Sequence, residues 1–210
     1  MTGANRSAPE RLVVASANPD KAREIDDALT GLGFHLVPRP DSVPDVEETG
    51  TTLVENARLK AMALVSATGL AAVADDTGLE VDSLGGAPGI FSARYAGPDC
   101  AYADNVDKLI REMAAARRNA RTARFRTVVV LARPDGTEVV AEGVAEGVIA
   151  DAPRGEGGFG YDSVFVPAGG RGRTFAEMAL AEKQRISHRG RALRALAQQV
   201  REASPTRPQE

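Results

Sequence analysis

The chain is poor in cysteine, histidine and aromatic residues. Of its 210 residues one is cysteine, two are histidine and none is tryptophan, and aromatic residues make up 4%. The single cysteine, Cys100, cannot form an internal disulfide, and it excludes a zinc cluster built on several thiolates. This cysteine usage fits a reducing compartment, so we expect a cytoplasmic protein. His35 and His188 leave little for soft metal ions.

Long hydrophobic runs are also missing. The longest, such as RTVVVLA over 126–132, fall far short of the roughly 20 apolar residues that a membrane-spanning helix needs. The opening MTGANRSAPE has no apolar core typical of a secretion signal. A formal net charge of −3 provides no general attraction to nucleic acid. We therefore expect neither a membrane nor a nucleic acid as a partner.

The chain does contain enough apolar residues for one globular unit. Hydrophobic residues make up 43% of its length, which is sufficient for a sizeable core. Residues 1–10 and 202–210 are polar, contain proline and lack apolar periodicity. We therefore predict disordered tails over 1–10 and 202–210, flanking a single domain over 11–201.

Between these ends, the hydrophobic period alternates between that of strands and that of helices. We predict strands over 11–16, 34–38, 70–75, 123–132, 137–150 and 161–166. We predict helices over 19–33, 52–69, 102–118 and 186–200. The Pro-Asp-Gly sequence at 134–136 indicates a hairpin between two long strands. This order predicts an α/β fold with a mixed β-sheet and flanking helices.

The motif SANPDK, residues 16–21, lies where the first strand meets the first helix. Asn18 and Pro19 suit a helix start, so the motif has a purely structural interpretation. Alternatively, the free N–H groups of the helix start, together with Lys21, form an anion site suited to phosphate. The glycines of a Walker loop or a dinucleotide fingerprint are missing.

A second motif, DVEETGTTLVENARLKA over 45–61, combines acids with a helix. Glu47 and Glu48 precede the helix, on which Asn56 and Lys60 share one face. The structural alternative is that the dipole at the helix start stabilises the two acids and that Lys60 is solvated.

The third motif, AAVADDTGLEV over 71–81, places two carboxylates after an apolar run. Successive side chains of a strand point to opposite faces, so Asp75 and Asp76 share a pocket only if the strand turns. Thr77 and Gly78 predict that turn. Carboxylates at the carboxyl end of a buried strand suit Mg²⁺, whereas the simpler interpretation is a capped turn.

Two glycine-containing motifs follow. In GEGGFGYD, over 155–162, glycines permit close backbone approach and Phe159 offers a face on which a base can stack; the alternative is a surface loop. In EKQRISHRG, over 182–190, Lys183, His188 and Arg189 supply donors for a phosphate or a purine carbonyl. The alternative there is that Ser187 caps the last helix. The basic run RRNARTARFR, over 117–126, is interpreted as a solvated helix end and strand start.

The motifs occur together and in a fixed order: SANPDK, EETG with ENARLKA, then residues 74–97, 157–165 and 174–190. This set resembles the inosine triphosphate pyrophosphatase family, from about Leu12 to Val200. The resemblance implies an elongated two-lobed fold around a long twisted mixed sheet, with the active site in the cleft between the lobes, and a homodimer. It implies that residues 11–201 form a nucleoside triphosphate pyrophosphatase domain.

The implied reaction is hydrolysis of the non-standard purine nucleoside triphosphates ITP, dITP and XTP to the monophosphate and pyrophosphate. The implied cofactor is Mg²⁺, with Mn²⁺ as a possible substitute. By the same resemblance Glu48 and Asp76 are metal ligands, and the catalytic residues are Asp76 as proton acceptor, Asp75 and Lys60. Substrate-binding residues would be Ser16, Ala17, Asn18, Lys21, Thr77, Phe159, Gly160, Tyr161, Asp162, Lys183, His188 and Arg189.

Two alternatives remain open. A septum-formation-type nucleotide pyrophosphatase would share the architecture and prefer other bases, but the SHRG and DDTGL elements count against it. A nucleotide-binding protein without turnover would not need Lys21, Glu48, Lys60 and Asp76 together.

Overall fold

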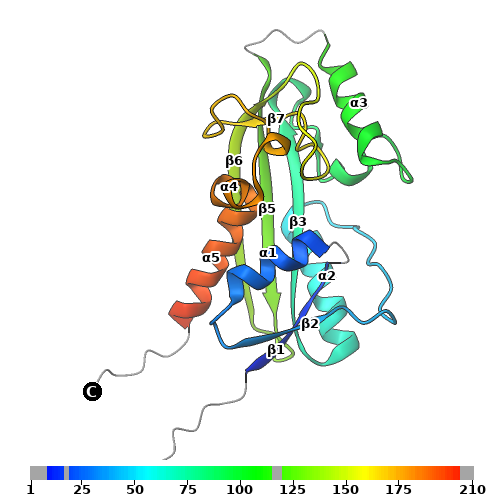
Figure 1. The fold of residues 1–210 in the computed structure, drawn as a ribbon. Coiled ribbons are helices and arrows are strands. Elements are labelled where there is room, and N and C mark those ends of the chain that lie inside the picture. Colours follow the sequence, from blue (N-terminus) through cyan, green and yellow to red (C-terminus); the bar gives the residue numbers. More distant parts are fainter. Residues whose placement is uncertain (1–8, 17–18, 115–119, 204–210) are drawn as a thin grey trace, which may run out of the picture.

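The computed structural model describes residues 9–16, 19–114 and 120–203 (Figure 1). The strands are β1 (Glu10–Val14), β2 (Phe34–Pro38), β3 (Ala71–Val81), β4 (Pro88–Gly89), β5 (Thr122–Ala132), β6 (Glu138–Ile149) and β7 (Phe165–Pro167). The helices are α1 (Pro19–Leu29), α2 (Leu53–Thr68), α3 (Tyr102–Glu112), α4 (Leu180–Ile186) and α5 (His188–Ala203). Thus β1 begins and α5 ends inside the stretches 1–10 and 202–210 that we predicted as tails; residues 1–8 and 204–210 lie outside the description.

These strands form one seven-stranded mixed sheet. Its order is β2-β1-β3-β5-β6-β7, with β4 paired to β3. The β1 strand is parallel to β2 and β3, whereas the pairs β3–β5, β5–β6 and β6–β7 are antiparallel. The predicted hairpin joins β5 to β6, where Gly136 N donates to Arg133 O at 3.0 Å. The predicted α/β fold with a mixed sheet is confirmed.

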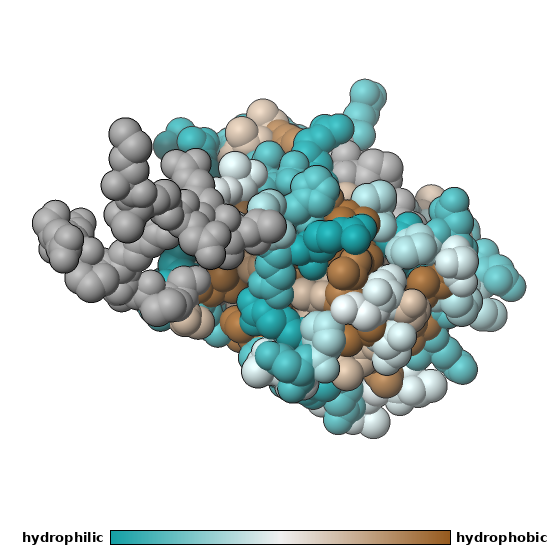
Figure 2. Space-filling model, turned by 90° about the horizontal axis from the view of Figure 1, so that it is seen from below, coloured by the Kyte–Doolittle hydropathy of each residue, from teal (hydrophilic) through white to brown (hydrophobic). Residues whose placement is uncertain are grey.

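Helices cover both faces of one half of this sheet. Because side chains alternate along β1, Val13 packs with α2 on one face, while Leu12 and Val14 pack with α1 and α5 on the other. Figure 1 shows α1 and α5 together on the lower half of the sheet and α3 at its upper end. Seen from below in Figure 2, hydrophilic residues surround and interrupt the hydrophobic ones. Among the helices of the described segments, none is both long and apolar enough to span a membrane.

The main departure from expectation is the length of β3. The predicted turn at Thr77 and Gly78 is wrong, because β3 stays paired with β5 from Ala72 to Val81. The glycine is needed for another reason: a Cβ atom at Gly78 would lie 2.7 Å from Gly89 O of β4. A close backbone approach therefore produced the same sequence signal as a turn.

Other elements also differ from the prediction: α1 ends at Leu29, and the short elements β4 and α4 were not predicted. The helix expected over 102–118 is assigned only as Tyr102–Glu112, and residues 115–119 lie outside the description. The strand expected over 161–166 is reduced to Phe165–Pro167. The last helix starts after a break at Ser187, whose Oγ accepts from Gly190 N at 3.1 Å, so the capping interpretation of Ser187 is confirmed.

The basic run 117–126 is neutralised where the structure describes it. Arg124 and Arg126 project from β5 and form ion pairs with acids of the neighbouring strands, among them Glu80 on β3. Arg121 is buried, contrary to the solvated interpretation, and its guanidinium donates to the carbonyl of Ile149 at 2.8 Å. These three arginines are therefore all paired with groups of the chain itself.

An aromatic cluster fills the core beside α5. The imidazole of His188 is 4% exposed and stacks on Phe125, with ring centroids 4.4 Å apart and an interplanar angle of 16°. Phe175 lies on another side of the same ring, at 6.0 Å. Burial, together with the charges of Arg189 and Lys183, lowers the pKa of His188 well below its ordinary value. The folded chain therefore holds His188 neutral.

This burial predicts a pH dependence of stability. Below about pH 6.5 the unfolded chain binds a proton at His188 that the folded chain does not, so the free energy of unfolding falls as the pH falls. The limiting contribution is about 1.4 kcal/mol per pH unit. His188→Phe, which keeps the stacking, should therefore lose less stability than the wild type between pH 7 and pH 5 in denaturant unfolding. Equal losses in both proteins would contradict the prediction.

Candidate functional site

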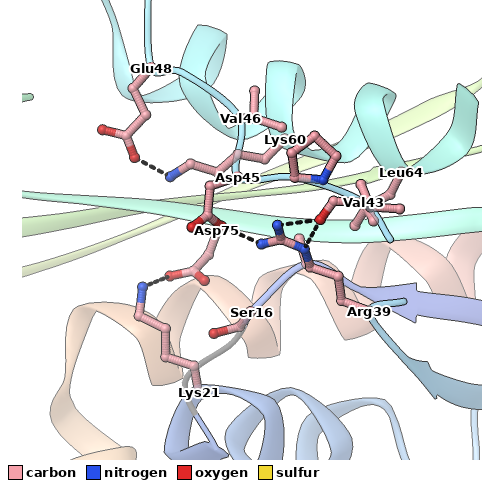
Figure 3. A pocket seen from close by; sticks show the side chains of 12 residues that line it. Ser16, Lys21, Arg39, Val43, Asp45, Val46, Glu48, Lys60, Leu64 and Asp75 are labelled. Atoms are coloured by element: carbon pink, nitrogen blue, oxygen red, sulfur yellow. Dashed lines mark hydrogen bonds and ion pairs between the residues drawn. The ribbon is translucent and has the colours of Figure 1, made fainter. Parts of the chain in front are cut away.

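Two adjoining pockets lie beside the middle of β3. The first, which we call the charged pocket, is lined by Ser16, Lys21, Arg39, Glu48, Lys60 and Asp75, among others (Figure 3). The second, the aromatic pocket, is lined by Thr77, Phe159, Tyr161, Lys183, His188 and Arg189, among others. Lys21 lines both pockets. The two pockets therefore meet at this lysine.

The parallel part of the sheet positions the charged pocket. Arg39 comes directly after the carboxyl end of β2, and Ser16 lies two residues beyond the carboxyl end of its parallel neighbour β1. The last β1 residue, Val14, is paired with Val73 of β3. Asp75 therefore lies just beyond the end of β1, on a strand that itself continues. The carboxyl edge of parallel strands is a common place for ligands in α/β sheets.

Asp75 projects toward α1 and α5. Its Oδ2 lies 3.3 Å from Lys21 Nζ and 3.2 Å from Nη2 of Arg189, and the hydroxyl of Thr77 donates to the same oxygen at 3.4 Å. Arg189 also pairs with the buried Glu24 at 3.3 Å. Burial by itself would raise the pKa of Asp75, but Lys21 and Arg189 hold it well below its usual range. Asp75 is therefore a permanent anion.

Asp76 projects toward α2, on the opposite face. Its Oδ1 lies 2.7 Å from Lys60 Nζ, and the amide of Asn56 approaches its other oxygen at 3.5 Å. Asn56 is fully buried, and its Oδ1 accepts from Gly50 N at 2.8 Å. The EETG segment is thereby tied to α2, and Asn56 and Lys60 lie on one face of α2 as predicted, because both contact Asp76. Burial, with the negative charges of Glu48 and Asp75, raises the pKa of Asp76 despite Lys60.

Glu48 reaches the same ammonium group from the EETG segment. One of its oxygens lies 2.6 Å from Lys60 Nζ, and the other lies 2.6 Å from Nη1 of Arg94. Desolvation opposes ionisation here, but Lys60 and Arg94 outweigh it and lower the pKa of Glu48. Two carboxylates thus converge on one cation.

The donor set is suited to a hard divalent ion. Mg²⁺ is typically held by one or two carboxylates together with phosphate oxygens and water, and Glu48 and Asp76 supply two such carboxylates. Their convergence on Lys60 Nζ means that a positive charge already lies between them. In the described part of the chain no group of three or more His, Cys, Asp or Glu side chains could hold a metal. An ion there would therefore depend on a ligand for its remaining contacts.

The glycine-rich motif forms one wall of the aromatic pocket. Asp162 accepts from the backbone N of Phe159 at 2.8 Å and from Lys183 Nζ at 2.6 Å. The guanidinium of Arg189 lies 5.4 Å and the ammonium of Lys183 lies 5.1 Å from the Phe159 ring centroid. Tyr161 donates to the carbonyl of Ser92 at 2.9 Å. The segment is thus held by buried hydrogen bonds, unlike a simple surface loop.

Most of the predicted site residues come together in this region. Lining the pockets are Ser16, Lys21, Glu48, Lys60, Asp75, Thr77, Phe159, Gly160, Tyr161, Asp162, Lys183, His188 and Arg189. Asp76 is connected to them through Lys60. Asp75 and Asp76 face opposite sides of the sheet, so the expectation that a turn brings them together is wrong. Ala17 and Asn18 lie outside the described residues.

Charged or polar residues of the site that were not predicted as site residues include Glu24, Arg39, Asn56 and Arg94. Asn56 and Arg94 belong to motifs that carry the family resemblance, so the sequence could have identified them as site residues. Glu24 and Arg39 lie on an ordinary helix face and in a loop. Only the tertiary structure brings them to Arg189 and to the charged pocket.

Comparisons with known proteins agree with this geometry. The chain is 50% identical over 199 residues to a dITP/XTP pyrophosphatase of Thermus thermophilus, covering 94% of this chain and 95% of that protein. It is 50% identical over 196 residues to a dITP/XTP pyrophosphatase of Streptomyces coelicolor, covering 91% and 98%. The structure of a HAM1 protein from Coxiella burnetii superposes with a TM-score of 0.85 at 42% identity, covering 92% of this chain and all of that one.

The matching region extends over nearly the whole chain. Residues 12–199 match the family model described as Ham1 family. This confirms the resemblance carried by the motifs, which was predicted over nearly the same span, from about Leu12 to Val200. The chain belongs to the Ham1 family.

Proposed function

We propose that this chain is a dITP/XTP pyrophosphatase. It hydrolyses non-standard purine nucleoside triphosphates to the nucleoside monophosphate and pyrophosphate, and so cleanses the nucleotide pool. The observation that carries the proposal is the convergence of Glu48 and Asp76 on Lys60, beside a second lysine, Lys21. The two close relatives that are dITP/XTP pyrophosphatases support the same activity.

The proposal includes an elongated fold of two lobes with the active site in the cleft between them. In support, the first half of β3 packs against α1 and α5 on one face and against α2 on the other. The second half of β3 packs in a separate core cluster with α3. The pockets lie beside the middle of β3, between these parts. We further propose a homodimer, on the family resemblance alone.

In this proposal the triphosphate occupies the charged pocket and the purine occupies the aromatic pocket. A triphosphate carries about four negative charges, so positioning and charge neutralisation dominate the chemistry. Lys21, where the pockets meet, is the main cation for the phosphates, and Lys60 is the second. Ser16 adds a hydroxyl at the end of β1. Ala17 and Asn18, which lie outside the described residues, are proposed as substrate-binding residues on the family resemblance alone.

Mg²⁺ is the proposed cofactor, with Mn²⁺ as a substitute, and Glu48 and Asp76 would hold it. When bound, the ion supplies a compact positive charge that neutralises the phosphates. Asp76 orients the attacking water at the α phosphorus and accepts its proton at a carboxylate oxygen. Asp75, a permanent anion, fixes Lys21 and Arg189 in position.

The base is recognised by donors. Inosine and xanthosine present an oxygen at purine C6, where adenosine presents an amino group. Donors buried at that edge reject adenine, because they would be left without partners. Arg189 and Lys183 supply such donors, and Phe159 offers its ring for stacking. The buried Nδ1 of His188, which has no hydrogen-bond partner among the described residues, provides a further polar contact.

The activity predicts a product pattern. With Mg²⁺, the protein should convert ITP, dITP and XTP to monophosphate and pyrophosphate, and should use ATP and dTTP poorly. Chromatography of the nucleotides with a phosphate and pyrophosphate assay measures both products. Release of orthophosphate, or equal use of ATP, would overturn the proposal. Preference for a non-purine triphosphate would instead favour a septum-formation-type enzyme, and binding without turnover a nucleotide-binding protein.

The two neighbouring aspartates should differ when each is made neutral. Asp76→Asn should keep the fold and lose most turnover, because it removes the proton acceptor and a metal ligand. Asp75→Asn should also lower the melting temperature, since it leaves the buried charges of Lys21 and Arg189 without their anion. Initial rates with dITP and thermal unfolding of both variants test this. Wild-type turnover in Asp76→Asn would contradict the assigned role.

A further inference from the structure

Arg39 lies in the charged pocket but has no role in the function proposed above. It comes directly after the last residue of β2, and its side chain is 20% exposed. Because β2 is parallel to β1, Arg39 lies at the same edge of the sheet as Ser16. Figure 3 shows its guanidinium pointing into the pocket, across from Lys21 and Lys60. A third cation therefore faces the space assigned to the phosphates.

Within the part of the chain that the structure describes, the polar contacts of Arg39 are with its own loop. Its Nη2 and Nε donate to the carbonyl of Val43 at 2.6 and 3.2 Å. Its Nη1 pairs with Asp45 at 2.6 Å. The side chain of Asp45 is 93% exposed, so it can leave the guanidinium and be solvated without any burial cost. The Val43 contact meanwhile keeps the guanidinium over the pocket.

We propose that Arg39 binds the pyrophosphate half of the triphosphate, with its Nη1 exchanging Asp45 for a phosphate oxygen. Arg39 lines only the charged pocket, whereas Lys21 lines both pockets. With the base in the aromatic pocket, the β and γ phosphates are the part of the substrate that extends past Lys21 toward Arg39. A guanidinium is well suited to phosphate oxygens, and hydrogen bonds to a charged group are the strong ones.

The effect of removing Asp45 on phosphate binding distinguishes this inference from a purely structural role of Arg39. If Asp45 competes with phosphate for the guanidinium, its removal strengthens phosphate binding. If Arg39 and Asp45 serve only to hold the loop, removal of either residue weakens phosphate binding. Asp41 is an exposed acid of the same loop that does not line the charged pocket. Asp41→Ala therefore matches Asp45→Ala in charge and isolates the contact with Arg39.

The inference rests on the proposed function, and binding of inorganic pyrophosphate with Mg²⁺ tests it separately from turnover. Arg39→Gln keeps a donor for Val43 and removes the charge; it should weaken pyrophosphate binding about tenfold or more, measured by calorimetry. Its affinity for inosine monophosphate should be unchanged, because the α phosphate stays near Asp76. Asp45→Ala should bind pyrophosphate more tightly than both the wild type and Asp41→Ala.

Three results would overturn the inference. They are unchanged pyrophosphate affinity in Arg39→Gln, an equal loss for monophosphate and pyrophosphate, and weaker pyrophosphate binding in Asp45→Ala. If Arg39→Gln unfolds at a lower temperature than the wild type, Asp45→Ala still decides between the two roles. Failure of the wild type to cleave dITP would overturn the proposed function instead, so the two failures are distinguishable.

Discussion

The site depends on the alternation of side chains along one strand. Asp75 and Asp76 are neighbours on β3, which stays extended because β5 is paired along its length. Their carboxylates must therefore point to opposite faces of the sheet. One face carries α1 and α5, which supply Lys21 and Arg189, and the other carries α2, which supplies Lys60. A single strand thus divides two adjacent acids between two sets of cations.

This division explains why the two carboxylates differ electrostatically. Asp75 is buried against Lys21 and Arg189, and they lower its pKa. Asp76 has one close cation, which it shares with Glu48, and burial raises its pKa. A buried ion pair contributes little net stability, because desolvation offsets the attraction, but loss of one partner is costly. The Asp75 network is therefore better understood as a device that fixes the positions of α1 and α5 than as a source of stability.

The sequence predicted the features that depend on local pattern. The strand over 34–38 has the predicted bounds, and α2 ends before Gly69, which adopts the left-handed conformation of a helix cap. Each motif also contains side chains that line or adjoin the two pockets. The length of β3 could not be predicted, because Gly78 serves a contact with β4 that the local sequence does not reveal. Glu24 could not be recognised either, since its partner Arg189 is 165 positions away.

The same network joins the two pockets. Arg189 lines the aromatic pocket and Lys21 lines both, and each of them pairs with the same oxygen of Asp75. A base that contacts Arg189 and a phosphate that contacts Lys21 therefore act on one buried anion. Displacement of either cation would leave Asp75 less well neutralised, at a cost that grows with its burial. Under the proposed function, correct seating of the base and correct seating of the phosphates favour each other through Asp75, although Asp75 lies on the opposite face of β3 from Asp76.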